Sequence, residues 1–544
     1  MPSISVDGIQ CTFEGKTSLL QAALDGGVEI PHYCYHPGLP VVASCRICLA
    51  EVSQPNPRND NKLELIPKLV PTCQTPAVDG AVVHLRSPKS VANQKSVMEM
   101  LLINHPLDCP VCDQAGECSL QDYSYRYGNS QSRFVEAKLK QPKKDVGPNI
   151  LLYSDRCIMC SRCVRFTREV SGTHELGIFG RGSSEQIDVF PGRALDNELA
   201  GNVVDICPVG ALLDKDFLMT MRVWNLTRTA SIDGITASGD NLSVETNEGK
   251  VYRFKPRTNM DVNRWWTSDE IRYGWKFVHS EERFAKPMRR THGVLEACDW
   301  EQAYRTTRKR LGEGDGDLLA IISPMLPSEE AYLLGRLALK LAPAAKLAIG
   351  PVPVDGEDKS FPGGYTVVAE KAPNARGVRR ALERLVDADD VLDAAAAEDL
   401  LGSGSVGRVL LTGNYPSAWA TPRLRSVLQK SEAFTVLIDT LPSGLTERDE
   451  VDVLLPGCTW LEKEGSFENH RHRMQSFEAA LAPREGARPE GRIALELLGL
   501  LDGEKAARYD AQKVRAEMGG AFLDEVHGPE GDAVLTSDVE YVAL

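Results

Sequence analysis

The chain has 544 residues, and its 76 acidic against 62 basic side chains give a formal net charge of −14 at pH 7. This length suits about three or four domains, each with its own core. The acidic balance argues against nucleic acid as the main partner, because phosphate neutralisation needs a basic surface. No apolar run approaches the length of a membrane helix, about 18 residues, and the N-terminus has no signal-peptide layout. We therefore expect a soluble, cytosolic chain that meets a membrane only through partners.

The 14 cysteines are unevenly distributed, since 12 of them lie at or before Cys207 and only Cys298 and Cys458 follow. In a long chain without a secretion signal, such clustering indicates metal binding rather than disulfides. The chemistry is therefore expected in the part of the chain that ends at Cys207. Cys298 and Cys458 are most simply interpreted as structural thiols.

The N-terminal region alternates short strands around one helix, a pattern typical of a small β-grasp-like domain. The expected elements are strands at 3–13, 47–52 and 80–85, a helix at 18–25 that Thr17 caps and Gly26-Gly27 ends, and a polar insert at 54–62. Cys11 lies in the first strand pair and is expected to be a buried small side chain. His32 and His36 bracket Cys34, and we interpret them as packing or surface residues.

Four cysteines in this region have the spacing C-x10-C-x2-C-x24-C, and we call them the N-terminal set: Cys34, Cys45, Cys48 and Cys73. Only the middle C-x2-C and the distant fourth cysteine agree with the plant-type ferredoxin spacing. A [2Fe–2S] cluster needs two thiolates per iron, which four cysteines supply. A structural zinc site with four thiolates is the alternative that spacing leaves open.

A second group combines three thiols with an imidazole, and we call it the His105 set: His105, Cys109, Cys112 and Cys118. A helix from Ser87-Pro88 to about Asn104 is expected to deliver it. The apolar face of that helix is predicted to comprise Val91, Val97, Met98, Leu101 and Leu102. Spacing alone is compatible with an iron–sulfur cluster and with zinc. The tyrosine-rich stretch 121–128 is expected to cover the site from water.

A third group follows a stretch at 137–147 that is interpreted as a basic linker. Its ligands have the [4Fe–4S] ferredoxin pattern C-x2-C-x2-C with a remote Cys-Pro, and we call them the Cys157 set: Cys157, Cys160, Cys163 and Cys207. Arg156, Arg162 and Arg165 lie alongside. They are candidates for offsetting cluster charge, and the alternative is a solvated basic face.

The second half of the chain first shows β alternation at 225–260 and then alternates strands with helices, which predicts a doubly wound α/β domain. Expected strands lie at 318–322, 346–349, 408–411, 435–438 and 451–455, and expected helices at 328–341, 376–386 and 421–430. No GxGxxG follows these strands, so NAD is not predicted on this chain. The tail after Gly503 is charged and is expected to be helical and then loose.

Long runs of this sequence resemble the large iron–sulfur subunit of respiratory complex I, the NADH:quinone oxidoreductase. The runs are Cys34-x10-Cys45-Arg-x-Cys48, His105-Pro-Leu-Asp-Cys-Pro-x-Cys-Asp-x-x-Gly-Glu-Cys118, Asp155-Arg-Cys-Ile-x-Cys-x-Arg-Cys-Val-Arg165 and Gly201-Asn-Val-Val-Asp-Ile-Cys-Pro-Val-Gly-Ala-Leu212. The resemblance implies a [2Fe–2S] cluster on the N-terminal set and a [4Fe–4S] cluster on each of the other two. The neutral imidazole of His105 would then raise the potential of its cluster relative to four thiolates.

The second half resembles a degenerate molybdopterin oxidoreductase domain through Glu462-Lys-Glu-Gly-Ser-Phe-Glu-Asn469 with Arg473 and Gln475, Ser328-Glu-Glu330, and Leu411-Thr-Gly-Asn414. The implied fold is α+β iron–sulfur modules followed by an α/β domain. The expected domains are a [2Fe–2S] β-grasp domain at 1–80, a [4Fe–4S] domain with the imidazole ligand at 81–136, a four-cysteine [4Fe–4S] ferredoxin-like domain at 137–220, a small β domain at 221–278, the degenerate α/β domain at 279–503 and a charged tail at 504–544.

Two departures from the family pattern carry expectations of absence. Some members hold a further cluster, whose ligand positions fall here on Asp233, Thr236, Asp240 and Ser268, none of them cysteine. That cluster is therefore expected to be absent. The C-terminal half is also much shorter than an active molybdenum domain, so we expect no molybdenum cofactor and a scaffolding role. Flavin is likewise not expected on this chain.

The resemblance implies an electron wire and no substrate chemistry, so no catalytic residue is named. Electrons from NADH, oxidised at the FMN of a partner flavoprotein, would enter at the N-terminal set, pass to the Cys157 set, then to the His105 set, and leave toward quinone. Expected partners are that flavoprotein, a small [2Fe–2S] subunit and other peripheral-arm subunits, on the cytoplasmic side of the inner membrane. The alternatives are an iron–sulfur subunit of an NAD-linked hydrogenase or formate dehydrogenase, and a zinc-stabilised scaffold without redox function.

Overall fold

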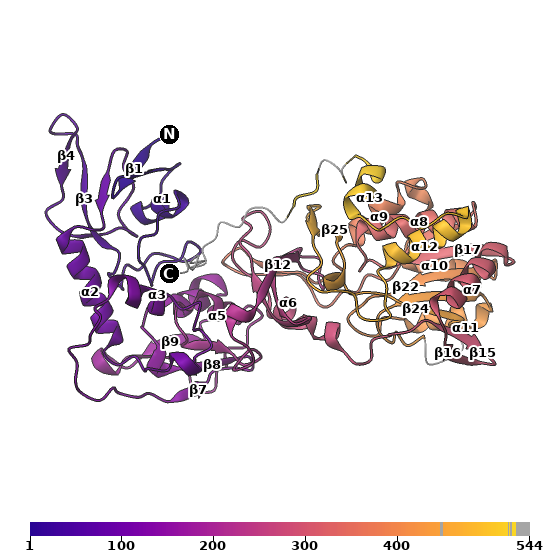
Figure 1. Cartoon of the computed structure of the whole chain (residues 1–544), viewed down its shortest axis with the longest axis horizontal. Helices are drawn as coiled ribbons and strands as arrows, with labels where there is room; N and C mark the ends of the chain where they lie inside the picture. The colour runs from indigo at the N-terminus through magenta and orange to yellow at the C-terminus, as the bar shows by residue number, and fades with distance from the viewer. Residues whose placement is uncertain (446–449, 521, 523–524, 529–544) are drawn as a thin grey trace. The chain divides into compact units, whose positions relative to one another are not determined.

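The computed structural model describes residues 1–445, 450–520, 522 and 525–528, and within them the chain forms two compact units (Figure 1). Unit 1 comprises Met1–Leu226 with Phe361–Tyr365. Unit 2 comprises Thr227–Ser360 and the described residues from Thr366 onward. The last part of the predicted tail, 529–544, lies outside the described residues.

Unit 1 begins with a mixed sheet in the order β2-β1-β6-β3-β4, in which β5 also pairs with β3. Its elements are β1 (Ser3–Val6), β2 (Ile9–Thr12), α1 (Leu19–Asp25), β3 (Leu49–Asn56), β4 (Lys62–Leu65), β5 (Val70–Pro71) and β6 (Val82–His84). Parallel pairing of β1 with β6 and the packing of α1 on the sheet give the expected β-grasp-like arrangement. Cys11 is buried on β2, as predicted.

Two details of this region differ from the prediction. The cap of α1 is Ser18, not Thr17, because the Ser18 side chain accepts a hydrogen bond from the amide of Gln21. The polar insert is not a loop throughout, since β3 runs to Asn56 and pairs antiparallel with β4. All four β4 residues are exposed, so pairing with β3 rather than burial stabilises this strand. For the same reason its sequence shows no alternation of buried and exposed residues that would predict a strand.

Helix α2 (Pro88–Leu102) starts at the Ser87 cap as predicted and leads to the 3-10 turn η1 (Cys109–Val111) and α3 (Ser119–Tyr127). The predicted apolar face of α2 is largely wrong. Its buried residues are Ser90, Gln94 and Met98, and of the five predicted residues only Met98 is buried. Ser90 and Gln94 are tolerated inside because both donate to main-chain carbonyls, those of His84 and Leu85.

The remainder of unit 1 is built from short elements. They are β7 (Lys143–Asp145), β8 (Ile150–Tyr153), α4 (Arg162–Arg165), a π-helical turn η3 (Phe166–Val170), β9 (Leu176–Phe179), β10 (Gln186–Val189), α5 (Asn202–Ile206) and β11 (Leu212–Asp214). The prediction of a basic linker at 137–147 is partly wrong, because β7 lies within this stretch and pairs with β8. The sheet β11-β8-β7 and the helix α5 frame the Cys157 set.

Unit 2 starts with the antiparallel sheet β12-β13-β14, which confirms the β pattern at 225–260, and continues into an eight-stranded mixed sheet in the order β16-β15-β24-β23-β22-β17-β18-β21 (Figure 1). The strands are β12 (Thr227–Ile232), β13 (Asn241–Asn247), β14 (Lys250–Pro256), β15 (Met288–Thr291), β16 (Val294–Ala297), β17 (Asp317–Ile322), β18 (Lys346–Ile349), β19 (Lys359–Ser360), β20 (Thr366–Val367), β21 (Val391–Leu392), β22 (Val406–Thr412), β23 (Phe434–Asp439), β24 (Val453–Pro456), β25 (Gly465–Glu468) and β26 (Met474–Phe477). The helices are α6 (Asp269–Tyr273), α7 (Trp300–Glu313), α8 (Ser328–Leu341), α9 (Ala375–Leu382), α10 (Ala394–Gly402), α11 (Pro422–Ser431), α12 (Glu490–Asp502) and α13 (Ala511–Met518).

The large sheet of unit 2 is covered on both faces, which confirms the doubly wound prediction. Leu318 and Ile322 of β17 pack with residues of α7, α8, α9 and α12. The alternate residues Leu319 and Ile321 pack with residues of α10 and α11. Six neighbouring strands from β24 to β21 run parallel, so their near-continuous apolar sequences follow from burial on both faces. In the part of the chain that is described, no helix has the length and apolar character needed to cross a membrane.

Two carboxyl groups buried in unit 2 predict how its stability depends on pH. Burial raises the pKa of Asp439 to about 6 and that of Asp233 to about 7. The folded chain therefore holds these protons more tightly than the unfolded chain does. The stabilisation is complete below the unfolded pKa values near 4 and is lost as the pH rises to about 7, at about 1.4 kcal/mol per unit of pKa shift.

Calorimetry between pH 5 and pH 8 is expected to show the melting temperature of unit 2 falling up to about pH 7 and then levelling. A rise over the same interval would contradict the assignment of these carboxyl groups as protonated in the fold.

Candidate metal centres

The N-terminal set is brought together by the loops that flank β3. Cys34 follows α1, Cys45 and Cys48 immediately precede β3, and Cys73 follows β5. The thiol of Cys34 contacts those of Cys45 and Cys73, and the thiol of Cys48 contacts that of Cys73. The hydrogen bond from Cys73 lowers the pKa of Cys48 to about 7, and the same contact raises the pKa of Cys73, so the two thiols share a proton.

The two histidines beside Cys34 make local hydrogen bonds. The Nδ1 atom of His32 lies 2.7 Å from the carbonyl oxygen of Ile30, and Nδ1 of His36 accepts from the amide of Gly38. Burial lowers the pKa of His32 to about 4, so its ring is neutral at pH 7. These contacts agree with a packing role.

All four cysteines of the Cys157 set line one cavity. Its empty volume is about 350 Å³, including the part open to solvent. Met159 and Ser161 adopt left-handed backbone conformations, at φ 54° and 59°, and this folds the loop around the cavity. The remaining walls are mostly apolar, from Leu152, Ile158, Ile187, Val209, Ala211 and Leu212, and Ser161 and Arg162 complete the lining. Burial raises the pKa of Cys157 to about 12 and of Cys160 to about 11, so these thiols ionise only when a bound cation compensates the charge.

The His105 set lies between the end of α2 and the start of α3. Cys109 is exposed at the start of η1, while Cys112 and Cys118 are buried. Nδ1 of His105 is buried and has no hydrogen-bond partner, which leaves it free as a donor to a metal. Burial, with Arg156 and Lys138 nearby, lowers the pKa of His105 to about 4, so the imidazole is neutral as a ligand must be.

The segment after the last ligand of the Cys157 set also contacts the His105 set. The carbonyl oxygen of Pro208 accepts from the amide of Ser119 at 3.1 Å and lies 3.9 Å from Sγ of Cys118. A Cβ atom at Gly210 would lie 2.2 Å from Sγ of Cys112, so only glycine fits there. The Cys-Pro-Val-Gly run thus abuts the neighbouring set at two positions.

The donor sets fit iron–sulfur clusters. The four thiols of the Cys157 set line one cavity, and a buried imidazole nitrogen of His105 has no hydrogen-bond partner, as a ligand to such a group would require. Within the described residues, no three or more His, Cys, Asp or Glu side chains converge as they would around one ion. Thiolates of a cluster bind different iron atoms, so a cluster does not require such convergence.

The arginines beside Cys157 are not a solvated basic face, so that alternative is wrong for two of them. Arg156 and Arg165 are each 3% exposed, and Arg162 is partly buried. Arg156 pairs with Asp108, next to Cys109, at 2.9 Å. Asp108 was not singled out from the sequence, although its place beside a ligand was a usable signal.

Part of the tyrosine-rich stretch provides the predicted cover. Tyr123 is buried, and its ring lies 5.2 Å from that of Tyr33 and 5.4 Å from that of Tyr127. Tyr125 is 89% exposed and provides none. Tyr33 is not among the residues predicted to cover the site, because it lies in a loop far from the tyrosine-rich stretch in sequence.

The ligand positions of the family's optional cluster include a hydrogen-bonded group centred on Asp233, which we call the Asp233 group. Asp233 accepts from the amides of Ile235 and Thr236 and from the hydroxyls of Thr236 and Ser238. Thr236, Asp240 and Ser268 are all buried. Side chains with carboxyl and hydroxyl groups therefore occupy these buried positions in place of cysteine thiolates.

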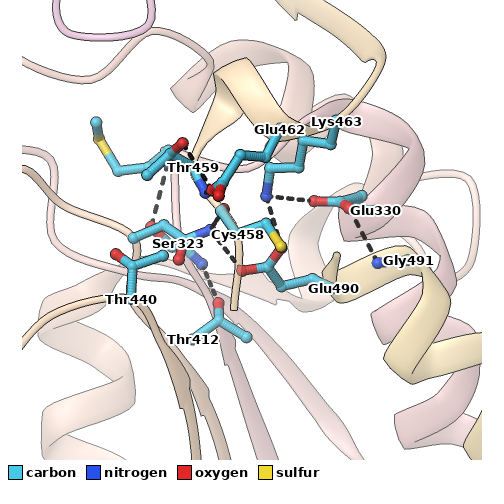
Figure 2. Close-up of polar contacts among 12 residues, drawn as sticks. Ser323, Glu330, Thr412, Thr440, Cys458, Thr459, Glu462, Lys463, Glu490 and Gly491 are labelled. Atoms are coloured by element: carbon cyan, nitrogen blue, oxygen red, sulfur yellow. Dashed lines mark hydrogen bonds and ion pairs between the residues drawn. The ribbon is translucent and has the colours of Figure 1, made fainter. Parts of the chain in front are cut away.

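Motif residues of the C-terminal half bind to one another and to Glu490, which lies outside the motifs. Figure 2 shows Lys463 between Glu330 and Glu490, with Nζ–O distances of 2.8 and 2.6 Å. All three side chains are at most 1% exposed, and the amide of Gly491 also donates to Glu330. Figure 2 also shows Cys458, fully buried beside this group.

Five family profiles match successive parts of the chain. Residues 2–88 match a 2Fe-2S iron-sulfur cluster binding domain, 94–133 the NADH-ubiquinone oxidoreductase-G iron-sulfur binding region, 147–213 the ferredoxin-like domain of NADH-quinone oxidoreductase subunit 3, 226–276 the NDSU1/NuoG-like 4Fe-4S domain of NADH-ubiquinone oxidoreductase, and 411–499 molybdopterin oxidoreductase. The stretch 226–276 contains no cysteine in this chain.

Similar curated proteins match somewhat less than two thirds of the chain. The mitochondrial NADH-ubiquinone oxidoreductase 78 kDa subunit of Candida albicans is 39% identical over 343 residues, which is 62% of this chain and 46% of that protein. The NADH-ubiquinone oxidoreductase 75 kDa subunit of Reclinomonas americana is 36% identical over 343 residues, 63% of this chain and 48% of that protein. The matches therefore span about half the length of these relatives.

A solved structure of an NAD+-reducing [NiFe]-hydrogenase in the H2-reduced state contains a chain with 30% identity to this one. The match covers 41% of this chain and 91% of that chain, with a TM-score of 0.35.

Proposed function

We propose that this chain is a large iron–sulfur subunit of NADH:quinone oxidoreductase and carries electrons from the NADH and FMN site of a partner protein toward quinone. The matches to iron–sulfur domains and to molybdopterin oxidoreductase support this proposal. The carriers would be one [2Fe–2S] cluster on the N-terminal set and one [4Fe–4S] cluster on each of the other two sets. Such clusters supply one-electron redox chemistry. The residues of this chain hold the clusters, exclude water and set the local charge.

One observation supports the central position of the Cys157 set: its loops contact both other sets. Pro208, after Cys207, touches Ser119 and Cys118 of the His105 set. On the other side, the guanidinium of Arg165 donates to the carbonyl oxygen of Cys34 in the N-terminal set. We therefore propose the order N-terminal set, Cys157 set, His105 set, with the exposed Cys109 at the exit.

The C-terminal half is proposed to be a scaffold without molybdenum. This proposal is supported by the buried contacts of the motif residues Lys463 and Glu330 with each other and of Lys463 with Glu490. The hydrogen bonds of the Asp233 group likewise support the absence of a further cluster. The proposed partners are the flavoprotein, the small [2Fe–2S] subunit and other peripheral-arm subunits, on the cytoplasmic side of the inner membrane, with membrane contact through these partners.

Metal analysis of the purified protein tests this proposal against a zinc-stabilised scaffold. About ten irons per chain are expected, two from the [2Fe–2S] cluster and four from each [4Fe–4S] cluster. Zinc with little iron would contradict the proposal, and about fourteen irons would contradict the absence of the further cluster.

Replacing His105 by cysteine is expected to retain the cluster and to lower its midpoint potential. The cause is the exchange of a neutral donor for an anionic thiolate. Potentiometric titration followed by EPR measures the change, and the other two clusters serve as internal references. An unchanged potential with a full iron content would show that the imidazole is not a ligand.

A further inference from the structure

The buried guanidinium of Arg165 joins the N-terminal set to the Cys157 set. Nη2 donates to the carbonyl oxygen of Cys34, and it lies 3.4 Å from the carbonyl oxygen of Cys160. Nη1 donates to the carbonyl oxygen of Pro40, and Nε lies 3.4 Å from Oγ of Ser161. One planar side chain thus bonds to the main chain of a ligand in each of two different sets.

No carboxylate neutralises this cation. In the described ranges, no Asp or Glu oxygen lies within 4.0 Å of the Arg165 guanidinium, and its direct partners are neutral oxygens. A buried charge without an ion-pair partner is expensive unless other charges compensate for it. Ligand thiols of the two sets it joins, Cys34, Cys160 and Cys163, lie close enough to act on its charge once they are ionised.

Arg162 supports the same junction by a different route. Its guanidinium donates to the carbonyl oxygens of Tyr35 and Ile206, the neighbours of Cys34 and Cys207. The two loops therefore stay joined when Arg165 alone is changed. This makes the charge of Arg165 separable from the architecture.

We propose that Arg165 is a positioning residue whose positive charge, placed between the N-terminal set and the Cys157 set, raises the potentials of both clusters together. The proposal rests on the proposed clusters. The physical basis is that each cluster gains negative charge on reduction, which a nearby cation in a medium of low polarity favours. A charge placed between the two sites shifts both potentials in the same direction.

The test compares Arg165→Gln, Arg165→Lys and the control Arg168→Gln in the intact complex, by EPR-monitored redox titration. Arg165→Gln is expected to lower the potentials of both clusters by at least a tenfold change in the reduction equilibrium, about 59 mV for one electron. Arg165→Lys keeps the charge and is expected to shift both by less than half as much. The His105 cluster should keep its potential in every variant, and Arg168→Gln should change none, because Arg168 is 53% exposed and pairs with Glu169.

Two results would overturn the proposal. One is a fully loaded Arg165→Gln with both potentials unchanged, and the other is an equal shift in the Lys and Gln variants. If Arg165→Gln does not load its clusters, Arg165→Lys decides: loading with near-normal potentials supports the role of charge, and loss of clusters there too contradicts it. A wild-type protein without clusters would refute the proposed function instead.

Discussion

Replacing Cys163 by alanine is expected to abolish electron transfer from NADH to quinone while leaving the other two clusters in place. Cys163 is a buried member of the Cys157 set, whose loops contact both other sets. Without its cluster the path between the entry and exit sets is interrupted. Iron should fall from about ten to about six per chain, since one [4Fe–4S] cluster is lost.

The matched control is Cys298→Ala, which removes a partly exposed thiol outside the three sets. It should keep about ten irons and normal turnover. The informative measurement is EPR after addition of NADH to the Cys163 variant. The [2Fe–2S] signal should appear and that of the His105 cluster should not; reduction of both would contradict the central position of the Cys157 set.

Replacing Lys463 by methionine is expected to destabilise unit 2 by about 3–5 kcal/mol, because Glu330 and Glu490 then share a buried site without a cation. The apparent melting temperature should fall by about 6 °C or more. Iron content and EPR signals should stay normal, since the three ligand sets lie in unit 1.

Lys340→Met is the matched control for this substitution. Lys340 pairs with Asp502 at 2.6 Å, but the two side chains are 51% and 45% exposed. Its loss should cost at most about 1 kcal/mol. A Lys463 variant as stable as this control would show that the motif residues do not hold the domain together.

Much of the fold was predictable because the local signals agree with the tertiary structure. The parallel strands β17, β18, β22 and β23 and helix α8 fall at their predicted places, since strands buried on both faces carry uninterrupted apolar runs. Exposed β4 and the polar inner face of α2 were missed. Pairing and long-range hydrogen bonds, not apolar periodicity, determine them.

The ligand sets were predictable from spacing and resemblance, whereas the groups around them were not. Arg165 reaches Cys34 across 131 positions of sequence, and Tyr33 approaches Tyr123 from a distant loop. Nothing local to either residue announces such a contact. Asp108 is the exception, because it directly precedes Cys109.

The central claim, a wire of three clusters within this chain, is tested most directly by EPR of the complex reduced with NADH. The account predicts one [2Fe–2S] signal from the N-terminal set and two [4Fe–4S] signals from the Cys157 and His105 sets. A third [4Fe–4S] signal that disappears on substitution of Asp233 would contradict the proposal that the Asp233 group binds no cluster. The absence of any NADH-reducible signal from this chain would contradict the wire itself.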